Sequence, residues 1–291
     1  MYLFDKGKRF YKGNFHMHTT ISDGVLTPEE ACAIYKANGY DFVAITDHRV
    51  MGRQRDIGGM LVLSGGEFDF SFPTQQLHLL AIMPDDVLAG TEISREDQNA
   101  FIQHILNHRG LVILAHPAWS LNTIEFIKNL GPLAAAEVFN SVSDAPWNGA
   151  RADSSHVLDL LYTNGRILPQ IAADDSHWYE GEQCRAYTMV QADSLTPGAI
   201  VEALRNGRFY ASQGPEFRSV EVLEDRIIVE TSPVEQFLFN SNLAYVKNRC
   251  RRGHDMASSE YVFQRGSGER YVRCEITDSQ GRRAWLSPLT L

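Results

Sequence analysis

Residues 14–24 of the chain read NFHMHTTISDG. Alternate side chains of a β-strand share one face, so His16 and His18 would project together from the same side. Two imidazoles on the core face of a strand are costly unless they find polar partners. At the end of a strand they can instead converge on a cation, with Asp23 close behind them in the sequence. The remainder of the chain decides between a satisfied core and a metal site.

The sequence around this stretch alternates between short apolar runs and helix-like segments through about residue 211. The apolar runs that predict strands are GNFHMH (13–18), DFVAITDH (41–48), MLVLSGGEF (60–68), QLHLLAIM (76–83), LVILAHP (111–117), AAAEVFN (134–140) and RILPQIAADDSH (166–177). The segments that predict helices are TPEEACAIYKANG (27–39), SREDQNAFIQHILNHRG (94–110), ADSSHVLDLLYTNG (152–165) and TPGAIVEALRNG (196–207). Thr27 and Glu30 are spaced as a capping box for the first helix, and Ser94 is expected to cap the second.

The alternation of strand and helix predicts parallel strands joined by right-handed crossovers. Closed into a ring, such strands form a barrel whose reactive residues lie at the C-terminal ends of the strands. After residue 212 the pattern changes to alternating, turn-punctuated segments, and DSQG (278–281) has the composition of a hairpin turn. We therefore predict an α/β barrel over residues 1–212 and a small antiparallel β domain over residues 213–291.

Histidine and carboxylate residues, which commonly bind metals, stand at the ends of the predicted strands or within them. They are His16, His18, Asp23, His48, Glu67, His78, His116, Asp175 and His177. A single histidine at a strand end is most often a packed or capping residue, but six of the ten histidines fall at equivalent places. Imidazole and carboxylate suit zinc, manganese or iron without a thiolate. Nine ligands exceed the needs of one ion, so we predict two or three divalent ions.

Composition narrows the classes of protein to consider. Hydrophobic residues make up 44% of the chain and charged residues 22%, which is ordinary for a globular protein. The net charge of −9 provides no basic field for duplex nucleic acid or an anionic membrane, although bound cations would make a local site more positive. The four cysteines form no C-x-x-C pair, and no apolar window is long enough to span a membrane. We therefore expect reduced thiols and a cytoplasmic protein.

The polar motifs resemble those of a known family in their order. HMH, SDG, ITDH, GGEF, LHLL, LAHP and DDSH, between residues 16 and 177, resemble the motifs of the polymerase and histidinol phosphatase (PHP) superfamily of metal-dependent phosphoesterases. The resemblance covers roughly residues 14–212 and implies a distorted, TIM-like (β/α)7 barrel that holds a trinuclear metal centre. The segment GRFYASQGP (207–215) and the β-rich tail are similar to a subgroup with a C-terminal β extension.

Carried over by position, the resemblance implies three metal sites. The first ion would be held by His16, His18, Glu67 and Asp175, the second by Glu67, His78 and His116, and the third by Asp23, His48 and His177. Asp174 is the alternative to Asp175, although the D-x-H spacing favours Asp175. Asp47 is the candidate to orient a ligating imidazole, with capping of the following loop as the alternative.

The predicted ions determine the chemistry. A water that bridges two of them would be hydroxide near neutral pH and could attack phosphorus in line. The candidate catalytic residues around that hydroxide are Asp23, His48, Glu67 and His177. The chain has no G-x-S-x-G elbow, no reactive-cysteine context and no G-x-x-x-x-G-K-[ST] motif that would offer another mechanism.

Several residues near the predicted strand ends are candidates for contact with a substrate. Arginine grips phosphate with its planar fork, and Arg49 and Arg185 follow the ITDH and DDSHW segments. The alternative for each is a solvated loop arginine. Trp119, Trp147 and Trp178 also follow strand-end segments, where they would line a substrate wall or pack in the core.

The leading hypothesis is a metal-dependent phosphoesterase that acts on a phosphorylated small molecule or nucleotide, as a monoester or a diester. A metal-dependent hydrolase of amides or esters is the alternative enzyme, because a metal hydroxide also attacks carbonyl carbon. The acidic balance disfavours a nuclease, and the basic run KNRCRR (247–252) is more typical of a solvated loop than of a nucleic-acid footprint. A non-catalytic metal-binding scaffold is the remaining alternative, and the complete ligand set counts against it. The sequence leaves the oligomeric state and the role of the β-rich tail open.

Overall fold

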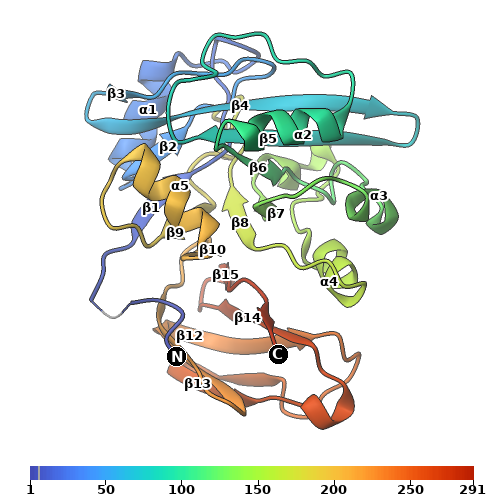
Figure 1. Cartoon of the computed structure of the whole chain (residues 1–291). Helices are drawn as coiled ribbons and strands as arrows, with labels where there is room; N and C mark the ends of the chain where they lie inside the picture. Colours follow the sequence, from blue (N-terminus) through green and yellow to red (C-terminus); the bar gives the residue numbers. More distant parts are fainter. Residues whose placement is uncertain (6) are drawn as a thin grey trace.

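The computed structural model describes residues 1–5 and 7–291, and it is rich in strands, with short helices outside the sheet (Figure 1). The helices are α1 (Pro28–Ala37), α2 (Gln98–Asn107), α3 (Ile124–Lys128), α4 (Ser155–Thr163) and α5 (Pro197–Arg205), with 3-10 helices η1 (Val142–Asp144), η2 (Pro146–Asn148) and η3 (Arg265–Ser267). The strands up to the end of α5 are β1 (Tyr11–Asn14), β2 (Phe42–Ala44), β3 (Arg55–Ile57), β4 (Met60–Phe72), β5 (Gln75–Met83), β6 (Leu111–Leu114), β7 (Ala135–Asn140), β8 (Gln170–Ala173) and β9 (Tyr187–Val190). The later strands are β10 (Phe209–Ser212), β11 (Phe217–Val222), β12 (Arg226–Ser241), β13 (Cys250–Val262), β14 (Tyr271–Thr277), β15 (Arg283–Trp285) and β16 (Leu289–Thr290).

Local sequence signals decide where the helices begin. α1 starts as predicted, because the Thr27 hydroxyl accepts the Glu30 N–H while the Glu30 carboxylate accepts the Thr27 N–H. The prediction that Ser94 caps the second helix is wrong. The cap of α2 is Asp97, whose carboxylate accepts the Ala100 N–H at 2.7 Å and also complements the positive end of the helix dipole. None of the described helices combines the length and apolarity that crossing a bilayer requires.

The described strands form one continuous sheet. Its order is β11-β12-β14-β15-β10-β9-β1-β2-β4-β5-β6-β7-β8, with β3, β13 and β16 paired at its sides. β1, β2 and β4 run parallel, and so do β6, β7 and β8, which confirms the mixed α/β class. The pairing of Asn14 with Val43 and of Ala44 with Leu63 brings the residues that follow β1 and β2 beside the middle of β4.

The ladder of described strands does not close into the predicted seven-stranded barrel. β4 and β5 form an antiparallel hairpin, because only residues 73 and 74 join them and a parallel pair needs a crossover of about a dozen residues or more. β9 lies antiparallel to both β1 and β10. At the open edge the Thr188 hydroxyl of β9 accepts the Ala172 N–H of β8 at 3.2 Å and donates to the Ala172 carbonyl at 3.0 Å. A side-chain bridge therefore stands where a backbone ladder would close the ring.

Apolar side chains cover both faces of the central strands. One core cluster contains Phe101 of α2, Leu79 and Leu114, and a second contains Leu204 of α5 and Ile113. Ile113 and Leu114 are neighbours on β6, so this strand is buried on both faces. Burial on both faces explains why the strands that precede the polar motifs are nearly continuous apolar runs rather than alternating ones.

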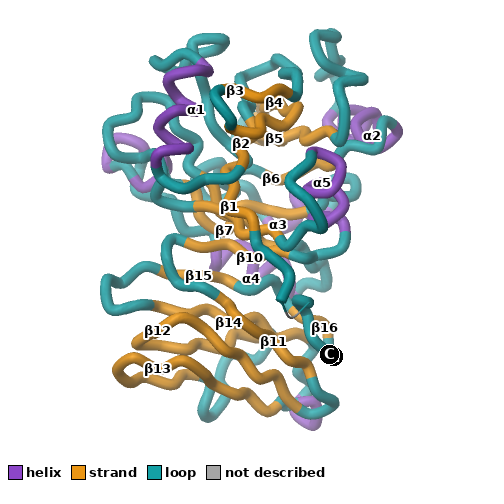
Figure 2. Tube along the Cα trace, turned by 90° about the vertical axis from the view of Figure 1, so that its left-hand side faces the viewer, coloured by secondary structure: helices purple, strands orange, loops and turns teal. Residues whose placement is uncertain are grey.

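The strands after β10 form antiparallel pairs (Figure 2). The described residues beyond 212 contain no α-helix, as predicted, and the short helical segment drawn there is the 3-10 helix η3. The hairpin predicted at DSQG is confirmed, because these residues join β14 to β15 and the Asp278 N–H donates to the Arg282 carbonyl. The basic run 247–252 passes from a loop into β13, where Arg251 and Arg252 are exposed.

Several contacts attach these last strands to the rest of the chain, among them a strand pairing and a buried ion pair. β15 pairs with β10, so the sheet continues across the predicted boundary between residues 212 and 213, and the division there stays a prediction. Arg273 of β14 is buried and donates from two nitrogens to the two oxygens of Asp159 on α4, each at 2.7 Å. A paired, charge-assisted contact of this kind fixes orientation as well as distance. It therefore holds α4 in a defined place against β14.

Candidate metal centre

The backbone brings the predicted metal-binding residues together at one edge of the sheet. His16 and His18 follow β1, His48 follows β2, His116 follows β6, and Asp175 and His177 follow β8. Isolated parallel bridges align these segments, since Met17 pairs with Ser176 and His48 pairs with Glu67. Glu67 and His78 lie inside the β4–β5 hairpin rather than at strand ends.

Ligand-type atoms of these residues gather into three groups, within each of which the atoms lie no more than 4.8 Å apart. The first group is His16, His18, Glu67 and Asp175, the second is Glu67, His78 and His116, and the third is His18, Asp23, His48 and His177. The structure thus brings together all nine residues, in the grouping that the family resemblance implies, with His18 added to the third group. Glu67 joins the first group to the second, and His18 joins the first to the third. Groups of this composition are able to hold divalent cations.

Glu67 is the centre of the arrangement. Its two carboxylate oxygens lie 2.8–3.4 Å from ring nitrogens of five imidazoles: His16, His18, His48, His78 and His116. The Glu67 side chain is only 1% exposed, so solvent does not surround the carboxylate. Burial alone would raise the pKa of Glu67, but the imidazoles outweigh it and hold that pKa well below its usual range. The carboxylate is therefore charged and available to bind a cation.

Asp175 is the second buried anion, and an uncommon backbone conformation positions it. Its φ of 55° lies in the left-handed region, which residues other than glycine adopt uncommonly and which aspartate tolerates better than most. The Asp175 N–H donates to the His16 carbonyl at 2.8 Å, and the Asp175 Oδ1 lies 3.1 Å from His16 Nε2 and 3.0 Å from His18 Nε2. This backbone conformation thus places the Asp175 carboxylate beside both imidazoles.

Several buried atoms of the first and third groups have no hydrogen-bond partner among the described residues. These atoms are His16 Nε2, His18 Nε2, His48 Nδ1 and Asp175 Oδ1. A buried polar atom left without a partner costs about 1–3 kcal/mol, and such atoms are rare in folded proteins. Imidazole nitrogens and carboxylate oxygens that lie close together without hydrogen-bonding one another are the donor set expected around zinc, manganese or iron. The residues present therefore fit a bound divalent metal.

The local electrostatics also favour a cation. Burial alone would lower the pKa of His18, but the nearby carboxylates of Asp175 and Glu67 outweigh it and raise that pKa to about 9. Negative charge that draws a proton onto a buried imidazole attracts a divalent ion as well, and the ion must displace the proton when it binds. In His48 and His177 the effect of burial prevails and lowers the pKa, so both rings are neutral near pH 7.

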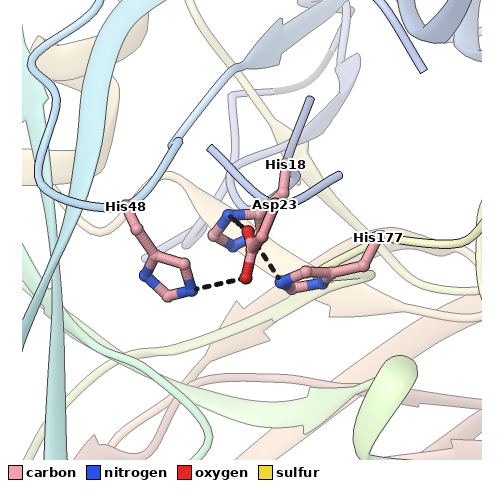
Figure 3. Close-up of side chains that lie close together, drawn as sticks. All are labelled: His18, Asp23, His48 and His177. Atoms are coloured by element: carbon pink, nitrogen blue, oxygen red, sulfur yellow. Dashed lines mark ion pairs between the residues drawn. The ribbon is translucent and has the colours of Figure 1, made fainter. Parts of the chain in front are cut away.

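The third group faces solvent. Figure 3 shows Asp23 among its three histidines, with Oδ2 3.6 Å from His48 Nε2 and Oδ1 3.5 Å from His177 Nε2. His18 Nδ1 also lies 3.5 Å from Asp23 Oδ1. The Asp23 side chain is 55% exposed, whereas His16 and His18 are fully buried. A molecule that enters from solvent would therefore meet Asp23, His48 and His177 before the first group.

Two buried residues of β7 support the centre, and the sequence prediction did not include them. The Glu137 carboxylate lies 2.8 Å from His16 Nδ1 and accepts the His116 N–H at 2.8 Å. The Asn140 amide donates to Glu137 at 2.8 Å and to Asp175 at 3.2 Å. Partners of this kind orient metal-binding side chains. The sequence did carry a signal for Glu137. It is the one charged residue in the apolar strand AAAEVFN, and a buried charge requires a polar partner.

Two further aspartates beside the motifs hold backbone rather than imidazoles. Asp174 is buried and accepts three backbone N–H groups and two hydroxyls, so Asp175, and not Asp174, lies among the histidines. The Asp47 carboxylate accepts the N–H and hydroxyl of Thr19 and the hydroxyl of Ser22. The Asp47 side chain therefore fixes the loop that follows His18 rather than capping the loop that follows Asp47 itself. It is linked to an imidazole only indirectly, because the Ser22 hydroxyl that donates to Asp47 lies 3.4 Å from His18 Nδ1.

The arginines predicted to bind substrate each have a carboxylate partner, and Arg49 lies beside the centre. Arg49 donates to Asp69 through two nitrogens, at 2.7 and 2.9 Å, and both residues line an open hollow beside Asp23. Arg185 donates to Asp144 at 2.8 Å. An anionic group would have to compete with these carboxylates for either guanidinium.

A pocket of about 210 Å³ lies at the centre. Its lining is Asp23, His48, Glu67, His78, His116, Trp119, Val142, Ser143, Trp147, Asn148, Asp175, His177 and Trp178. The three tryptophans therefore line the pocket, as the substrate-wall hypothesis expects, and Trp147 and Trp178 are exposed rather than packed in the core.

Comparison with known proteins identifies the fold. The sequence matches no protein-family model and no curated protein. The structure is similar to the crystal structure of a two-domain protein from Bacteroides vulgatus that contains a predicted PHP-like metal-dependent phosphoesterase, with a TM-score of 0.55 and 17% sequence identity. The similarity covers 99% of this chain and 97% of that one. The predicted resemblance to the PHP superfamily is thus confirmed at the level of the fold, which is what a match of this identity shows.

Two weaker similarities cover little more than half of this chain. An amidohydrolase from Chromobacterium violaceum with bound sulfate and no metal aligns over 58% of this chain and 89% of its own, with 14% identity and a TM-score of 0.40. A protein from Bifidobacterium adolescentis, proposed to be a metal-dependent phosphoesterase, aligns over 57% and 87%, with 15% identity and a TM-score of 0.37. At these TM-scores neither similarity supports a statement about this chain.

Proposed function

We propose that this protein is a metal-dependent phosphoesterase that hydrolyses a phosphomonoester or phosphodiester of a small molecule or nucleotide. One observation carries the proposal: Glu67 and His18 join three groups of imidazoles and carboxylates into a continuous centre that opens into a pocket. A centre that holds adjacent divalent ions suits a phosphate, whose several oxygens carry charge that more than one ion can share. The similarity of fold to a PHP-like protein agrees with this chemistry.

The three groups would hold the ions. The first ion would lie among His16, His18, Glu67 and Asp175, the second among Glu67, His78 and His116, and the third among Asp23, His48 and His177. When bound, zinc, manganese or iron supplies Lewis acidity, which neutralises phosphate oxygens and lowers the pKa of water. The buried carboxylates Glu67 and Asp175 balance that positive charge. Glu137 and Asn140 keep the first two groups oriented.

The solvent-facing residues are the ones that would act on the substrate. Asp23, His48 and His177 lie at the pocket, and burial lowers the pKa of both imidazoles, so each is a neutral base near pH 7. Either ring is therefore able to accept a proton at its Nε2 when it does not bind an ion. The buried His18, in contrast, has no exposed surface and serves to hold the centre together.

Arg49 and Arg185 would hold the non-reacting part of the substrate. Arg49 is the better placed of the two, since it shares its open hollow with Asp23 and His48. Its side chain is more than half exposed, which leaves the guanidinium accessible while Asp69 orients it. A planar guanidinium held in this way is suited to a phosphate or carboxylate of the substrate.

A phosphatase assay on metal-reconstituted protein tests the proposal. Manganese, zinc and iron are supplied in turn, the substrates are an aryl phosphate, a bis-aryl phosphodiester and a panel of nucleotides, and bound metal is counted in each sample. We expect metal-dependent turnover that is lost in His18→Ala. His156→Ala, which removes an exposed histidine of α4, is the matched control and should behave as the unmodified protein.

Each outcome points to a different activity. Turnover of one ester class and not the other would decide between monoester and diester. Bound metal without turnover of any phosphoester would favour the hydrolysis of an amide or ester, and competition by carboxylates but not by inorganic phosphate would support that alternative. A protein that binds no metal under any of these conditions would contradict the proposal and leave a non-catalytic scaffold.

A further inference from the structure

The pocket at the metal centre is lined by indoles as well as by ligand-type side chains. Trp119, Trp147 and Trp178 share the 210 Å³ space with Asp23 and His177. The hydrolytic chemistry proposed above requires the aspartate and the histidine but assigns no role to the indoles. Three of the four tryptophans of the chain therefore lie in one small pocket without an assigned function.

Two of these indoles are exposed at the pocket. Trp147 is 65% exposed and Trp178 is 41% exposed, and their ring centroids lie 4.6 Å apart in an edge-to-face arrangement. Trp285, in contrast, is fully buried in the core. Large aromatic side chains are usually well buried, and exposed ones that gather at a concave surface mark a binding site. The exposed pair therefore favours a ligand that covers it.

The loops that carry the exposed pair are fixed in place. The Asn148 side chain, next to Trp147, accepts from Trp119 Nε1 and donates to the Val142 carbonyl. The Trp178 N–H donates to the Glu182 carboxylate at 2.7 Å. A ligand that packs on these rings would therefore lose little free energy to ordering the loops, because the loops are already ordered.

The exposed pair also lies beside the reacting end of the pocket. The Trp178 ring stacks on the His177 ring, with centroids 5.1 Å apart and planes inclined by 25°. His177 belongs to the third, solvent-facing group together with Asp23 and His48. A phosphate held at that group would place the group attached to it next to Trp178.

We infer that the leaving group of the substrate carries a planar aromatic ring, which packs on Trp147 and Trp178 while its phosphate lies at the metal centre. This inference rests on the proposed phosphoesterase function. Aromatic rings favour offset-stacked and edge-to-face contacts with indoles, and such contacts tolerate different rings, so a nucleobase and a simple aryl group both satisfy the site. A sugar or alkyl phosphate would leave the exposed indoles without a partner.

Binding of non-hydrolysable phosphonates to the metal-loaded full chain separates recognition of the ring from catalysis. Benzylphosphonate and cyclohexylmethylphosphonate are similar in size and differ in aromaticity. The phosphonate analogues of adenosine 5′-monophosphate and ribose 5-phosphate form a second pair, which tests a nucleobase in place of an aryl group. Calorimetry measures each affinity, and the same compounds with cleavable ester oxygens measure turnover.

We expect the member that carries an aromatic ring to bind about tenfold tighter or more than its partner in at least one pair, because an aromatic stacking contact is of that size. Trp147→Ala and Trp178→Ala should each remove most of that preference. Because both indoles are exposed, neither change should unfold the protein. Tyr245→Ala removes an aromatic ring that is 84% exposed outside the pocket, and it should leave the preference intact.

Equal affinities within both pairs, or a preference that survives both tryptophan substitutions, would overturn the inference. Turnover of phosphoesters without any preference for an aromatic ring would overturn the inference and leave the phosphoesterase function standing. A ring preference that depends on Trp147 and Trp178, without turnover of any phosphoester, would support the aromatic site and contradict the phosphoesterase function.

Discussion

Glu137 Oε1 and His16 Nδ1 lie 2.8 Å apart, and both side chains are fully buried. The carboxylate can accept only from a protonated Nδ1, so when the ring is neutral, as metal binding requires, His16 Nε2 is the nitrogen without a proton. That nitrogen lies beside Glu67 and Asp175, where a metal would bind. The second oxygen of Glu137 accepts the His116 N–H, so one carboxylate orients residues of two groups.

Glu137→Gln is expected to weaken metal binding without removing a ligand. The amide keeps the shape of the carboxylate but loses the charge that favours a proton on His16 Nδ1, and loss of such a partner typically costs 10- to 100-fold in metal affinity. Competition with a coloured chelator measures the affinity. Glu269→Gln is the matched control, because Glu269 is also buried but accepts from Tyr261 and Gln264, outside the centre. An equal loss in both variants would argue for a general effect on folding.

Glu67→Gln is expected to lower the number of bound ions more than His78→Ala does. Glu67 belongs to the first and second groups, whereas His78 belongs only to the second. Elemental analysis of protein dialysed against each metal gives the count, and His156→Ala on the exposed face of α4 serves as the control. If both variants lose the same number of ions, Glu67 is not shared between sites.

The sequence predicts the composition of the centre well because its residues lie where strands end. His16, His48 and His116 each follow a short apolar run. A strand that is buried on both faces is a continuous apolar run, which can be recognised in the sequence without knowing which strands pair. Glu67 and His78 belong to a hairpin rather than to strand ends, and it is the register of β4 with β5 that brings them to the same place. The sequence analysis expected Glu67 to close one apolar run and His78 to interrupt another, and the strand end expected at Glu67 is wrong because β4 continues to Phe72.

The closure of the sheet and the supporting residues of the centre could not be predicted in the same way. Whether β8 pairs with β9 depends on contacts between distant segments, such as the Thr188 bridge to Ala172. No local pattern records those contacts, because propensity and periodicity describe only neighbours along the chain. The partners of Asp47 likewise come from tertiary packing, since Thr19 lies 28 residues away. Glu137 alone carried a local signal, as an isolated charge in an apolar strand.

Glu182→Gln is expected to loosen the loop that carries His177 and Trp178. The Glu182 carboxylate accepts the N–H groups of His177, Trp178, Tyr179 and Glu180. An amide offers one acceptor oxygen in place of two, so at least one of these N–H groups loses its partner, at a cost of about 1 kcal/mol. We expect a lower affinity for metal at the third group with little change at the first.

Metal titration and urea unfolding measure the two effects of Glu182→Gln. Glu180→Gln, in the same loop, is the matched control and should change neither. If the substitution lowers the free energy of unfolding but leaves every metal affinity unchanged, then Glu182 stabilises the loop without positioning His177.

Asp153→Asn is expected to lower the free energy of unfolding near neutral pH, and the loss should shrink in acid. Asp153 precedes α4, and Arg283 of β15 donates to its carboxylate at 2.6 Å. Burial alone would raise the pKa of Asp153, but Arg283 and the hydrogen bond from the Ser155 N–H outweigh it and lower that pKa from 3.8. A carboxyl whose pKa is lower in the folded state stabilises the fold above about pH 3.8, and this contribution disappears as the pH falls through the folded-state value.

Urea unfolding of the two proteins between pH 7 and pH 3 measures this dependence. Because the Asp153 side chain is 39% exposed and the Arg283 side chain 25% exposed, solvent screens the pair and the difference at pH 7 should be no more than about 1 kcal/mol. Asp225→Asn changes a side chain that is 58% exposed beside Arg226, and it should have a smaller effect throughout. A difference between Asp153→Asn and the unmodified protein that grows on acidification would show that the carboxylate is not held by Arg283 in solution.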